Sequence, residues 1–440
     1  MDAMTWLKSE KAIISSKKQY AHFDRKTDLS HQWAYVSNPE KIRTHSFYPF
    51  IHYQINSVKF SKQKGKRQKS RDICYAAHID RCIYQYYSFM LNNIYNERVQ
   101  NDGISSVAVA YRTNLHESNI EFSKYAFDFI KENDPCYIMI GDFTGFFDNL
   151  DHRYLKKQLC SLLHAAALPS DYYAVFKSIT AYSKWELADI LELNGYENSR
   201  KGRKTLNNKD RVLSKVQYDQ YRSHITKNTD GFGIPQGSPI SAVLANIYML
   251  ETDKAVNECV LAAGGKYMRY SDDFIVIIPD SSEAYSKETL EKVISIIEQT
   301  PRLQLEPNKT QYFRYADNIL SNCSSAFHAK ADASNRNINF LGFSFDGYGV
   351  RVRAKTISKY YYRMNRKAKT IAKSKGYTPT GKHISCKNLY KRYSERGANE
   401  SPGNFLTYIN HASKTYGTKE GIDRDTKKHM QKIRRAINGK

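Results

Sequence analysis

Continuous apolar runs in two central parts of the chain predict buried β-strands. Residues 136–140 (CYIMI) form one run, and residues 274–278 (FIVII) form another. Residues 51–60 (IHYQINSVKF) alternate between apolar and polar positions, which is typical of a half-buried strand, and residues 303–305 are also strand-like. Short runs rich in β-branched and aromatic residues favour paired strands over helices. The sequence therefore predicts a sheet built from distant parts of the chain.

Apolar positions recur every three or four residues in other segments, which predicts helices. This spacing is found in residues 80–96, 151–155, 240–250, 282–300 and 351–375. Pro301 is expected to end the fourth of these helices, and Asp148 to cap the helix that starts near residue 151. Strands and helices in this mixture predict an α+β fold.

The composition limits the partners that the protein can have. The chain has 440 residues and a net charge of +24, which predicts a polyanionic partner such as nucleic acid. No run approaches the roughly 18 apolar residues that span a bilayer, so we expect no membrane partner. The seven cysteines are scattered and form no CxxC pair, as in the reduced thiols of a cytoplasmic protein.

Acidic residues follow the two apolar runs. Tyr270-Ser271-Asp272-Asp273 reads as a tight turn between two strands, and Asp142 ends the strand predicted at residues 136–140. Three carboxylates from two non-adjacent strands can hold two Mg²⁺ ions about 3.5–4 Å apart, an arrangement that activates an attacking hydroxyl group. Three unrelated surface acids are the alternative.

A loop rich in Gly and Pro lies between these acids in the sequence. It spans residues 231–239 (GFGIPQGSP) and precedes the apolar helix predicted at residues 240–250. Because Gly has no Cβ, such a loop lets a nucleotide approach the backbone closely. Gln236 would offer its amide to an incoming base or sugar.

Together these segments resemble the core motifs of reverse transcriptases, including those of group II introns and retrons. Asp142 with FFD at 146–148, GIPQGSP at 233–239 and YSDD at 270–273 match motifs A, B and C in order and spacing. Further similar segments are the basic fingers motif at 64–73, residues 110–112 after it, motif D at 305–310, the primer grip at 340–343 and a thumb motif at 401–417. The resemblance implies RNA-directed DNA polymerase activity.

The resemblance also implies a right-hand polymerase architecture, with an antiparallel palm sheet flanked by helices and a helical, basic thumb. The expected domains are an N-terminal extension (1–50), fingers (51–135), a palm that includes fingers elements (136–345), and a thumb with a basic C-terminal segment (346–440). An insertion is expected at about 190–230 within the palm. Its polar stretch, residues 194–230, is expected to be mostly a solvated loop.

The family pattern assigns a catalytic group. Asp142 and Asp272 would bridge two Mg²⁺ ions, with Mn²⁺ as a possible substitute, and Asp273 would be a weaker or indirect ligand. The backbone carbonyl of Phe143 would be a further metal ligand. Lys309, at the motif D position, would act as a general acid for the departing pyrophosphate.

The family pattern also assigns contacts to the incoming deoxynucleoside triphosphate. Lys64 and Arg71 would bind its phosphates, with Arg71 preferred because a guanidinium can engage two oxygens. Gln236 and Gly237 would lie beside the nucleotide. Phe147 would collide with a ribose 2′-hydroxyl, so the enzyme is expected to make DNA, while Phe146 is expected in the core.

The nucleic-acid partners are expected to be an RNA template and its complementary DNA product. Arg112 and Gly342 occupy segments that contact nucleic acid in the family. An amphipathic helix at 351–375 would present a basic face to phosphates. The basic face comprises Lys359, Arg363, Arg366, Lys367 and Lys373, and the apolar stripe comprises Ile357, Tyr361, Met364, Ala368 and Ile371.

Size and the thumb segment bring the chain closest to stand-alone bacterial reverse transcriptases of the unknown-group and abortive-infection lineages, which are associated with defence against phage. This placement implies a dedicated non-coding RNA template. Two alternatives are a retron-like or mobile-element reverse transcriptase and a catalytically inactive RNA-binding scaffold. The sequence carries no signal for the oligomeric state.

Overall fold

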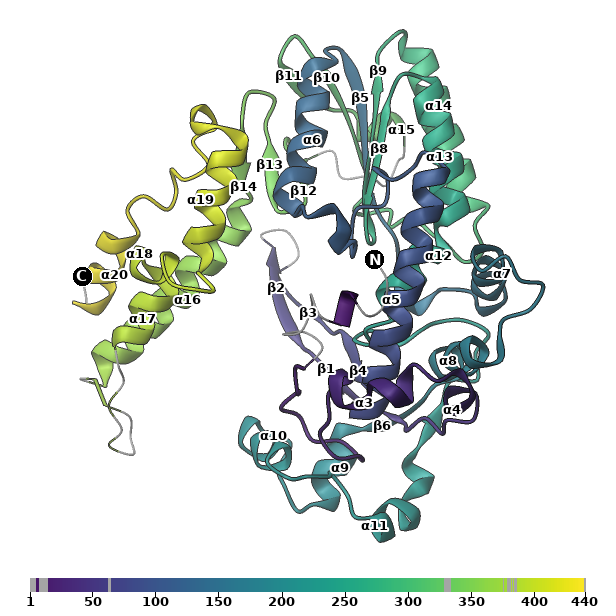
Figure 1. The fold of residues 1–440 in the computed structure, drawn as a ribbon. Helices are drawn as coiled ribbons and strands as arrows, with labels where there is room; N and C mark the ends of the chain where they lie inside the picture. Colours follow the sequence, from purple (N-terminus) through teal and green to yellow (C-terminus); the bar gives the residue numbers. More distant parts are fainter. Residues whose placement is uncertain are drawn as a thin grey trace. The chain divides into compact units, whose positions relative to one another are not determined.

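The computed structural model describes most of the chain (Figure 1). The described residues are 5–7, 15–61, 65–327, 334–374, 376–377, 381, 383 and 386–438. They form two compact units, each assembled from three separate stretches of sequence. Unit 1 comprises Met1–Arg112, Phe143–Asn257 and Ile294–Gln304, and unit 2 comprises Thr113–Asp142, Glu258–Val293 and Leu305–Lys440. The mixture of helices and strands confirms the α+β prediction, while the linear domain boundaries stay a prediction.

Unit 2 is built on a five-stranded antiparallel sheet in the order β11-β10-β5-β9-β8. Its strands are β5 (Cys136–Asp142), β8 (Lys266–Tyr270), β9 (Asp273–Pro279), β10 (Gln311–Ala316) and β11 (Ile319–Asn322). The central strand β5 is buried along its whole length, which explains why its sequence is continuously apolar. The two buried strands predicted from the apolar runs are confirmed.

Helices cover this sheet. The helix α6 (Asn119–Glu132) packs against β8 and β9 and buries Ile120, Phe122, Ala126, Phe127 and Ile130. It begins with a capping box in which Ser118 and Glu121 satisfy each other's backbone amides. The helix predicted at residues 282–300 is α14 (Glu283–Glu298), and its predicted apolar face is buried at Leu290, Val293 and Ile297.

The C-terminal part of unit 2 is a small sheet followed by helices (Figure 1). The sheet contains β12 (Ile338–Phe340), β13 (Phe343–Phe345) and β14 (Val350–Val352). The helices are α16 (Ala354–Lys373), α17 (Cys386–Tyr393), α18 (Glu395–Ala398), α19 (Phe405–Tyr416) and α20 (His429–Ile437). Met364, Ala368 and Ile371 of α16 share a core with Leu389 of α17 and Ile433 of α20. The helix predicted at 351–375 is thereby confirmed.

Unit 1 contains a four-stranded sheet in the order β4-β1-β6-β7. Its strands are β1 (Phe50–Gln54), β4 (Asp72–Tyr75), β6 (Ser183–Glu186) and β7 (Thr226–Lys227). A separate hairpin pairs β2 (Ser57–Ser61) with β3 (Gly65–Lys69). The single strand predicted at residues 51–60 is therefore wrong: it divides after Ile55, whose amide and carbonyl both pair with Arg71.

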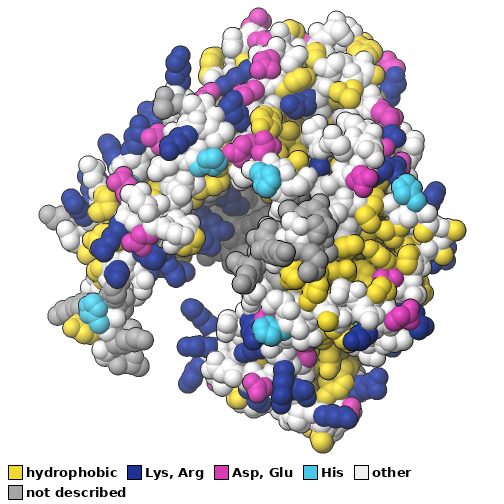
Figure 2. Space-filling view, viewed as in Figure 1, with side chains coloured by type: hydrophobic (Ala, Val, Ile, Leu, Met, Phe, Trp, Pro, Cys, Tyr) yellow, Lys and Arg dark blue, Asp and Glu magenta, His cyan; other side chains and the backbone are white. Residues whose placement is uncertain are grey.

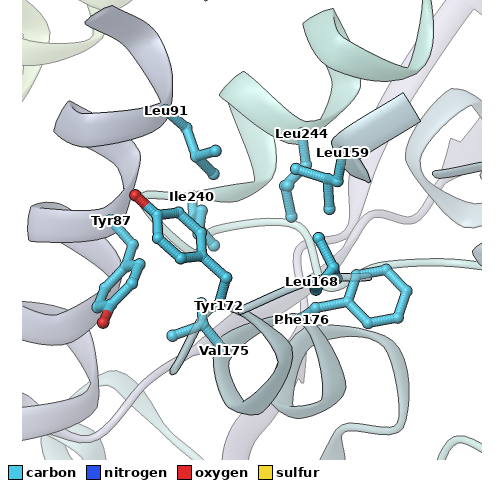
Figure 3. Close-up of a pocket in the computed structure, with 9 residues that line it drawn as sticks. All are labelled: Tyr87, Leu91, Leu159, Leu168, Tyr172, Val175, Phe176, Ile240 and Leu244. Carbon is cyan, nitrogen blue, oxygen red and sulfur yellow. The ribbon is translucent and has the colours of Figure 1, made fainter. Parts of the chain in front are cut away.

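Helices make up the rest of unit 1. They include α3 (Leu29–Val36), α4 (Pro39–Arg43), α5 (His78–Asn101), α7 (His152–Leu162), α8 (Ser170–Thr180), α9 (Leu187–Leu193), α10 (Arg200–Asn207), α11 (Lys215–Gln220) and α12 (Ser241–Tyr248). A further helix, α13 (Leu250–Ala262), follows α12 directly, so the helix predicted at 240–250 is divided at Met249. Apolar side chains of α5, α7, α8 and α12 meet around a void of only about 10 Å³ (Figure 3). This interior is closely packed and serves as core.

The polar stretch at residues 194–230 was predicted to be mostly a solvated loop; most of its side chains are exposed as predicted, but its backbone is more regular than a loop. It folds into α10, α11 and β7. Three of its apolar side chains, Leu206, Val212 and Leu213, are buried in a core that also contains Phe23 and Trp185. The free energy gained by burying these side chains offsets the conformational entropy lost when the polar residues between them become ordered. None of the described helices is long and apolar enough to cross a membrane.

Candidate active site

The acidic turn joins β8 to β9 in unit 2. Tyr270 pairs with Asp273, so Ser271 and Asp272 form a two-residue hairpin turn, as predicted. Ser271 has a positive φ of 61°, which suits the twist of a tight hairpin. Arg269 is fully buried and donates from Nη1 to the carbonyl of Ser271 at 2.9 Å. A buried guanidinium therefore fixes the turn that carries the acids.

The same sheet brings the third acid to this turn. β5 and β9 are antiparallel neighbours, and Asp142 is directly opposite Asp273 in their register. Asp142 is the last residue of β5 and is 9% exposed. The predicted meeting of the strand at 136–142 with the acidic turn is confirmed, whereas the metal-binding roles of these residues stay predictions.

The carboxylates influence one another electrostatically. Burial and, after it, the negative charges of Asp272 and Asp142 raise the pKa of Asp273 to about 6. Lys309 and Arg353 act in the opposite direction. Asp273 thus lies where negative charge is concentrated, and a cation would relieve this repulsion.

Lys309 is the cation at Asp142. Its Nζ lies 2.5 Å from Oδ2 of Asp142, and the amide of Glu306 donates to the carbonyl of Asp142 at 2.8 Å. The motif D segment is therefore held against the end of β5. The strand predicted at residues 303–305 is wrong, because the bond from the Thr144 amide to the Gln304 carbonyl does not extend into a ladder.

Gly141 is a residue of this site that the sequence analysis missed. It is opposite Phe274 in the β5–β9 register, and a Cβ added at Gly141 would lie 2.2 Å from Cζ of that ring. Phe274 is fully buried. The only signal in the sequence is a glycine within an otherwise β-prone run, directly before an acid. Gly141 leaves room for the ring beneath the carboxylates.

The acidic side chains of this site suit hard divalent cations, because all the side-chain atoms that could bind a metal are carboxylate oxygens. Among the residues that the structure describes, no three His, Cys, Asp or Glu side chains form a ready-made metal cluster. The ion pair between Lys309 and Asp142 is formed instead. Mg²⁺ therefore fits the charge and the donor atoms, with the Lys309 ammonium as its competitor at Asp142.

The motif B loop and the FFD segment belong to unit 1. The side-chain amide of Gln236 donates to Oδ1 of Asp148 at 3.3 Å. The backbone carbonyl of Gln236 accepts from the backbone amide of Cys74 at 2.8 Å. Gly237 has a φ of 111°, and a Cβ there would lie 2.6 Å from the Cys74 carbonyl oxygen. Phe146 is buried as predicted, and Phe147 is half-buried. The nucleotide-binding roles of Phe147, Gln236 and Gly237 stay predictions.

Asp148 does not cap the following helix, which corrects the prediction. The N-cap of α7 is Asp151, whose carboxylate accepts from the amide of Tyr154 at 2.8 Å. Asp148 ends a short 3₁₀ turn and receives the Gln236 amide instead. The helix itself starts at His152, close to the expected position, so only the capping residue was assigned wrongly.

The predicted phosphate-binding residues of the fingers motif are only partly described. Lys64 lies outside the described residues. Arg71 is exposed, and its backbone pairs with Ile55. Its role in phosphate binding stays a prediction.

Arg112 has a structural role, which corrects its assignment to nucleic acid. It is 5% exposed, and its guanidinium donates to the side chain of Asn96 at 2.7 Å and to the carbonyl of Ala108 at 3.1 Å. Further bonds go to the carbonyl and the hydroxyl group of Ser105. With these four hydrogen bonds in the interior, Arg112 holds the chain after α5.

The predicted primer grip forms the β12–β13 hairpin of unit 2. Its two turn residues, Leu341 and Gly342, both have positive φ, 46° and 91°. The side-chain amide of Asn119 donates to the carbonyl of Leu341 at 2.7 Å and to the hydroxyl group of Tyr408 at 2.9 Å. The turn is thus fixed to α6 and α19. Contact between Gly342 and a primer stays a prediction.

The basic face of α16 is exposed at Lys359, Arg363, Arg366 and Lys373, while Lys367 is half-buried. The apolar stripe is as predicted except at one position. Tyr360, and not Tyr361, is the buried tyrosine, and the Tyr361 hydroxyl group donates to the Asp425 carbonyl. The sequence analysis missed Lys391 and Arg392 on α17, which lie beside this face.

A family model described as "Reverse transcriptase (RNA-dependent DNA polymerase)" matches residues 61–345. The match covers more than half of the chain, so the chain belongs to the reverse transcriptase family. It is an RNA-directed DNA polymerase, as the motifs predicted. No curated protein matches the chain in sequence.

Several solved telomerase structures are similar to the chain. Apo telomerase from Candida tropicalis has a TM-score of 0.40 and 12% identity, with 99% of this chain and 75% of that chain covered. The same telomerase truncated from its C-terminal domain has a TM-score of 0.39 and 12% identity, with coverages of 80% and 67%. Telomerase from Candida albicans, in complex with a TWJ fragment of telomeric RNA, has a TM-score of 0.37 and 13% identity, with coverages of 93% and 65%. The chain spans about two thirds of the last two proteins.

Proposed function

We propose that this reverse transcriptase extends a DNA strand on an RNA template by a two-metal reaction at Asp142, Asp272 and Asp273. One observation carries the proposal: β5 and β9 are paired in the register that sets Asp142 opposite Asp273, with Asp272 in the adjoining turn. Antiparallel pairing fixes this register along seven residue pairs, so the acids are positioned by the most buried strands of unit 2.

Mg²⁺ would be held by the carboxylates of Asp142, Asp272 and Asp273 and by the Phe143 carbonyl, and it would supply charge neutralisation and a more acidic primer hydroxyl group. The chain's own residues supply the rest. Arg269 holds the acidic turn. Lys309, held at Asp142 by an ion pair, carries protons that it can donate as charge develops on the departing pyrophosphate.

We further propose the finer biology that the family resemblance suggests. The template would be a dedicated non-coding RNA, and the product would serve in defence against phage. Support comes from the thumb segment at 401–417 and from the basic surface of α16 and α17. The seven cysteines are free thiols, which suits the reducing cytoplasm that we propose as the location.

Primer extension tests the polymerase proposal. The wild-type protein, a primed RNA template, deoxynucleoside triphosphates and Mg²⁺ should yield extended DNA. Asp272→Asn should reduce the rate by at least about a thousandfold, since it removes one anionic ligand at the reacting centre. Asp219→Asn, which removes an exposed carboxylate from α11, is the matched control and should retain full activity. Undiminished extension by Asp272→Asn would contradict the assignment.

Sequencing of nucleic acid that co-purifies with the protein tests the biological proposal. A single recurrent RNA with complementary DNA would support a dedicated template. DNA joined to RNA through a branch would favour the retron-like alternative. Unchanged phage plaque numbers with and without the active protein would contradict the defence role.

A further inference from the structure

A hollow in the helical part of unit 2 has no role in the chemistry described above. It has a volume of about 760 Å³ and lies between α16, α17 and the start of α19. Its charged lining comprises Lys359, Arg363, Lys391 and Arg392, and its aromatic lining comprises Tyr360, Tyr393 and Phe405. Figure 2 shows Lys and Arg side chains gathered over the part of the molecule where Figure 1 places α16 and α17. The volume falls in the range of sites that hold one small ligand.

Positive charge in this hollow is largely uncompensated. Lys391 has an ion pair with Glu400 at 3.1 Å. Among the described residues, Lys359, Arg363 and Arg392 have no acidic partner within 4.0 Å, the limit for an ion pair. Burial and then the charge of Arg392 lower the pKa of the neighbouring Lys367. Crowded cations of this kind favour an anionic ligand such as phosphate.

The hollow also has an aromatic floor. Tyr360 is 7% exposed, and its ring centroid lies 4.7 Å from that of Phe405 and 5.5 Å from that of Tyr393. The Tyr360 hydroxyl group donates to the Tyr393 carbonyl at 2.8 Å, so the polar end of this ring is already satisfied. Tyr360 is thus a buried support for Phe405, which is partly exposed, and the ring of Phe405 is suited to a flat, apolar group such as a nucleobase.

Fixed contacts hold the walls in place. The side-chain nitrogen of Asn404 donates to the carbonyls of Lys391 at 3.1 Å and Ser394 at 2.8 Å. The side-chain oxygen of Asn404 accepts from the Leu406 backbone amide at 2.8 Å. Asn404 therefore ties α17 and the start of α18 to the first turn of α19. The shape of the hollow results from these bonds and from the core that α16 and α17 share.

We propose that this hollow binds an unpaired nucleotide of a nucleic-acid strand. The base would lie against Phe405, which Tyr360 supports from beneath, and the flanking phosphates would pair with Lys359, Arg363 and Arg392. A duplex is a convex cylinder whose bases are stacked inside, so it would contact the rim without filling the hollow. The proposal rests on the proposed function in one respect, namely that such a strand is the RNA template or the DNA product.

Fluorescence anisotropy with the full chain tests this site. The probes are a short single-stranded RNA, a single-stranded DNA of the same sequence and the blunt RNA–DNA duplex. The variant Lys359→Gln/Arg363→Gln/Arg392→Gln removes the cations of the hollow. The variant Lys355→Gln/Lys369→Gln/Lys414→Gln removes the same charge from exposed positions that do not line it.

The hollow variant should bind single strands at least about tenfold more weakly, and the slope of log K against log salt should fall by about 2, as for three lost phosphate contacts. The control variant should lose less than about threefold. Phe405→Leu should weaken single-strand binding without changing the salt slope. Equal losses in both charge variants, or an equal loss of duplex binding, would overturn the proposal.

The two single-stranded probes separate the two sources of the nucleotide. Tighter binding of RNA assigns the site to the template, tighter binding of DNA assigns it to the product, and equal binding supports recognition through phosphate and base alone. Arg363→Gln by itself, with folding checked by thermal unfolding, serves if the triple variant is unstable. Primer extension by the wild type is measured alongside, so an inactive polymerase with intact single-strand binding would contradict only the proposed function.

Discussion

The expected selection of deoxyribose over ribose depends on a single side chain, that of Phe147. The FFD segment offers two adjacent rings, and the structure separates them: Phe146 is buried, whereas Phe147 is half-buried, with its ring centroid 5.5 Å from that of Phe146. Sequence alone predicted this division, since the family position of the second ring assigns it to sugar selection. The exposed part of Phe147 is what remains to contact a substrate.

Phe147→Ala is expected to raise the incorporation of ribonucleotides relative to deoxyribonucleotides by about tenfold or more. Removal of the ring removes the steric exclusion of a 2′-hydroxyl group, and tenfold corresponds to about 1.4 kcal/mol of discrimination. Extension with each class of triphosphate, measured for both proteins, gives the ratio. Phe146→Leu should leave the ratio unchanged, and an unchanged ratio in Phe147→Ala would remove Phe147 from the site.

Gly141→Ala is expected to destabilise the protein by about 1–3 kcal/mol and to reduce extension. Its Cβ would meet the Phe274 ring at 2.2 Å, and because this ring is fully buried, its displacement would disturb the surrounding core. The end of β5, and Asp142 with it, would shift away from β9. Urea denaturation and primer extension measure the two effects.

A second substitution separates this steric cause from others. Phe274→Leu removes the atoms that the new Cβ would meet, so the pair Gly141→Ala/Phe274→Leu should recover part of the activity lost by Gly141→Ala. The two changes are in contact, and non-additive effects are expected. Strictly additive losses would mean that Gly141 acts for another reason.

Among the elements, α5 shows how the N-terminal segment contributes to the fold. Ala77 at the N-cap of α5 provides no side-chain hydrogen bond. Asp24, far earlier in the sequence, accepts from the amides of His78 at 2.9 Å and Ile79 at 2.8 Å. The sequence analysis placed residues 1–50 in an N-terminal extension and assigned them no role. The structure shows that they cap the longest helix of unit 1.

Asp24→Ala is expected to lower the free energy of unfolding by about 2 kcal/mol, since it leaves two amides at a buried helix start without their acceptor. Asp24→Asn keeps one acceptor oxygen and should lose about half as much. Urea denaturation of both variants gives the comparison. Equal stabilities of wild type and Asp24→Ala would show that water or another group replaces the carboxylate.

The elements that the sequence predicted well are those with strong local patterns. The apolar runs gave β5 and β9, the SDD turn gave the β8–β9 hairpin, and the helical spacing gave α14 and α16. The failures depend on distant partners. Arg112 was wrongly assigned to nucleic-acid binding. Its hydrogen bonds to Asn96 and Ser105 could not be predicted from the sequence, since they depend on the fold. Local patterns also could not show that Leu206 is buried in the same core as Phe23.

At the scale of the whole molecule, the chain combines a net charge of +24 with a concentration of acids at one sheet end. The basic residues supply affinity for a polyanion that does not depend on sequence. The acids would repel the same polyanion unless cations neutralised them. Burial and, after it, the charges of Asp272 and Asp142 raise the pKa of Asp273, which shows how strongly the acids influence one another.

The central claim is that Asp142 on β5 and Asp272 in the β8–β9 turn share divalent ions. Anomalous diffraction from crystals soaked in Mn²⁺ with a non-hydrolysable deoxynucleoside triphosphate tests it most directly. The account predicts two anomalous peaks about 3.5–4 Å apart, with both carboxylates in contact with the ions and Lys309 released from Asp142. Peaks bound elsewhere, or an Asp142 that keeps its ion pair with Lys309 while Mn²⁺ is bound, would contradict it.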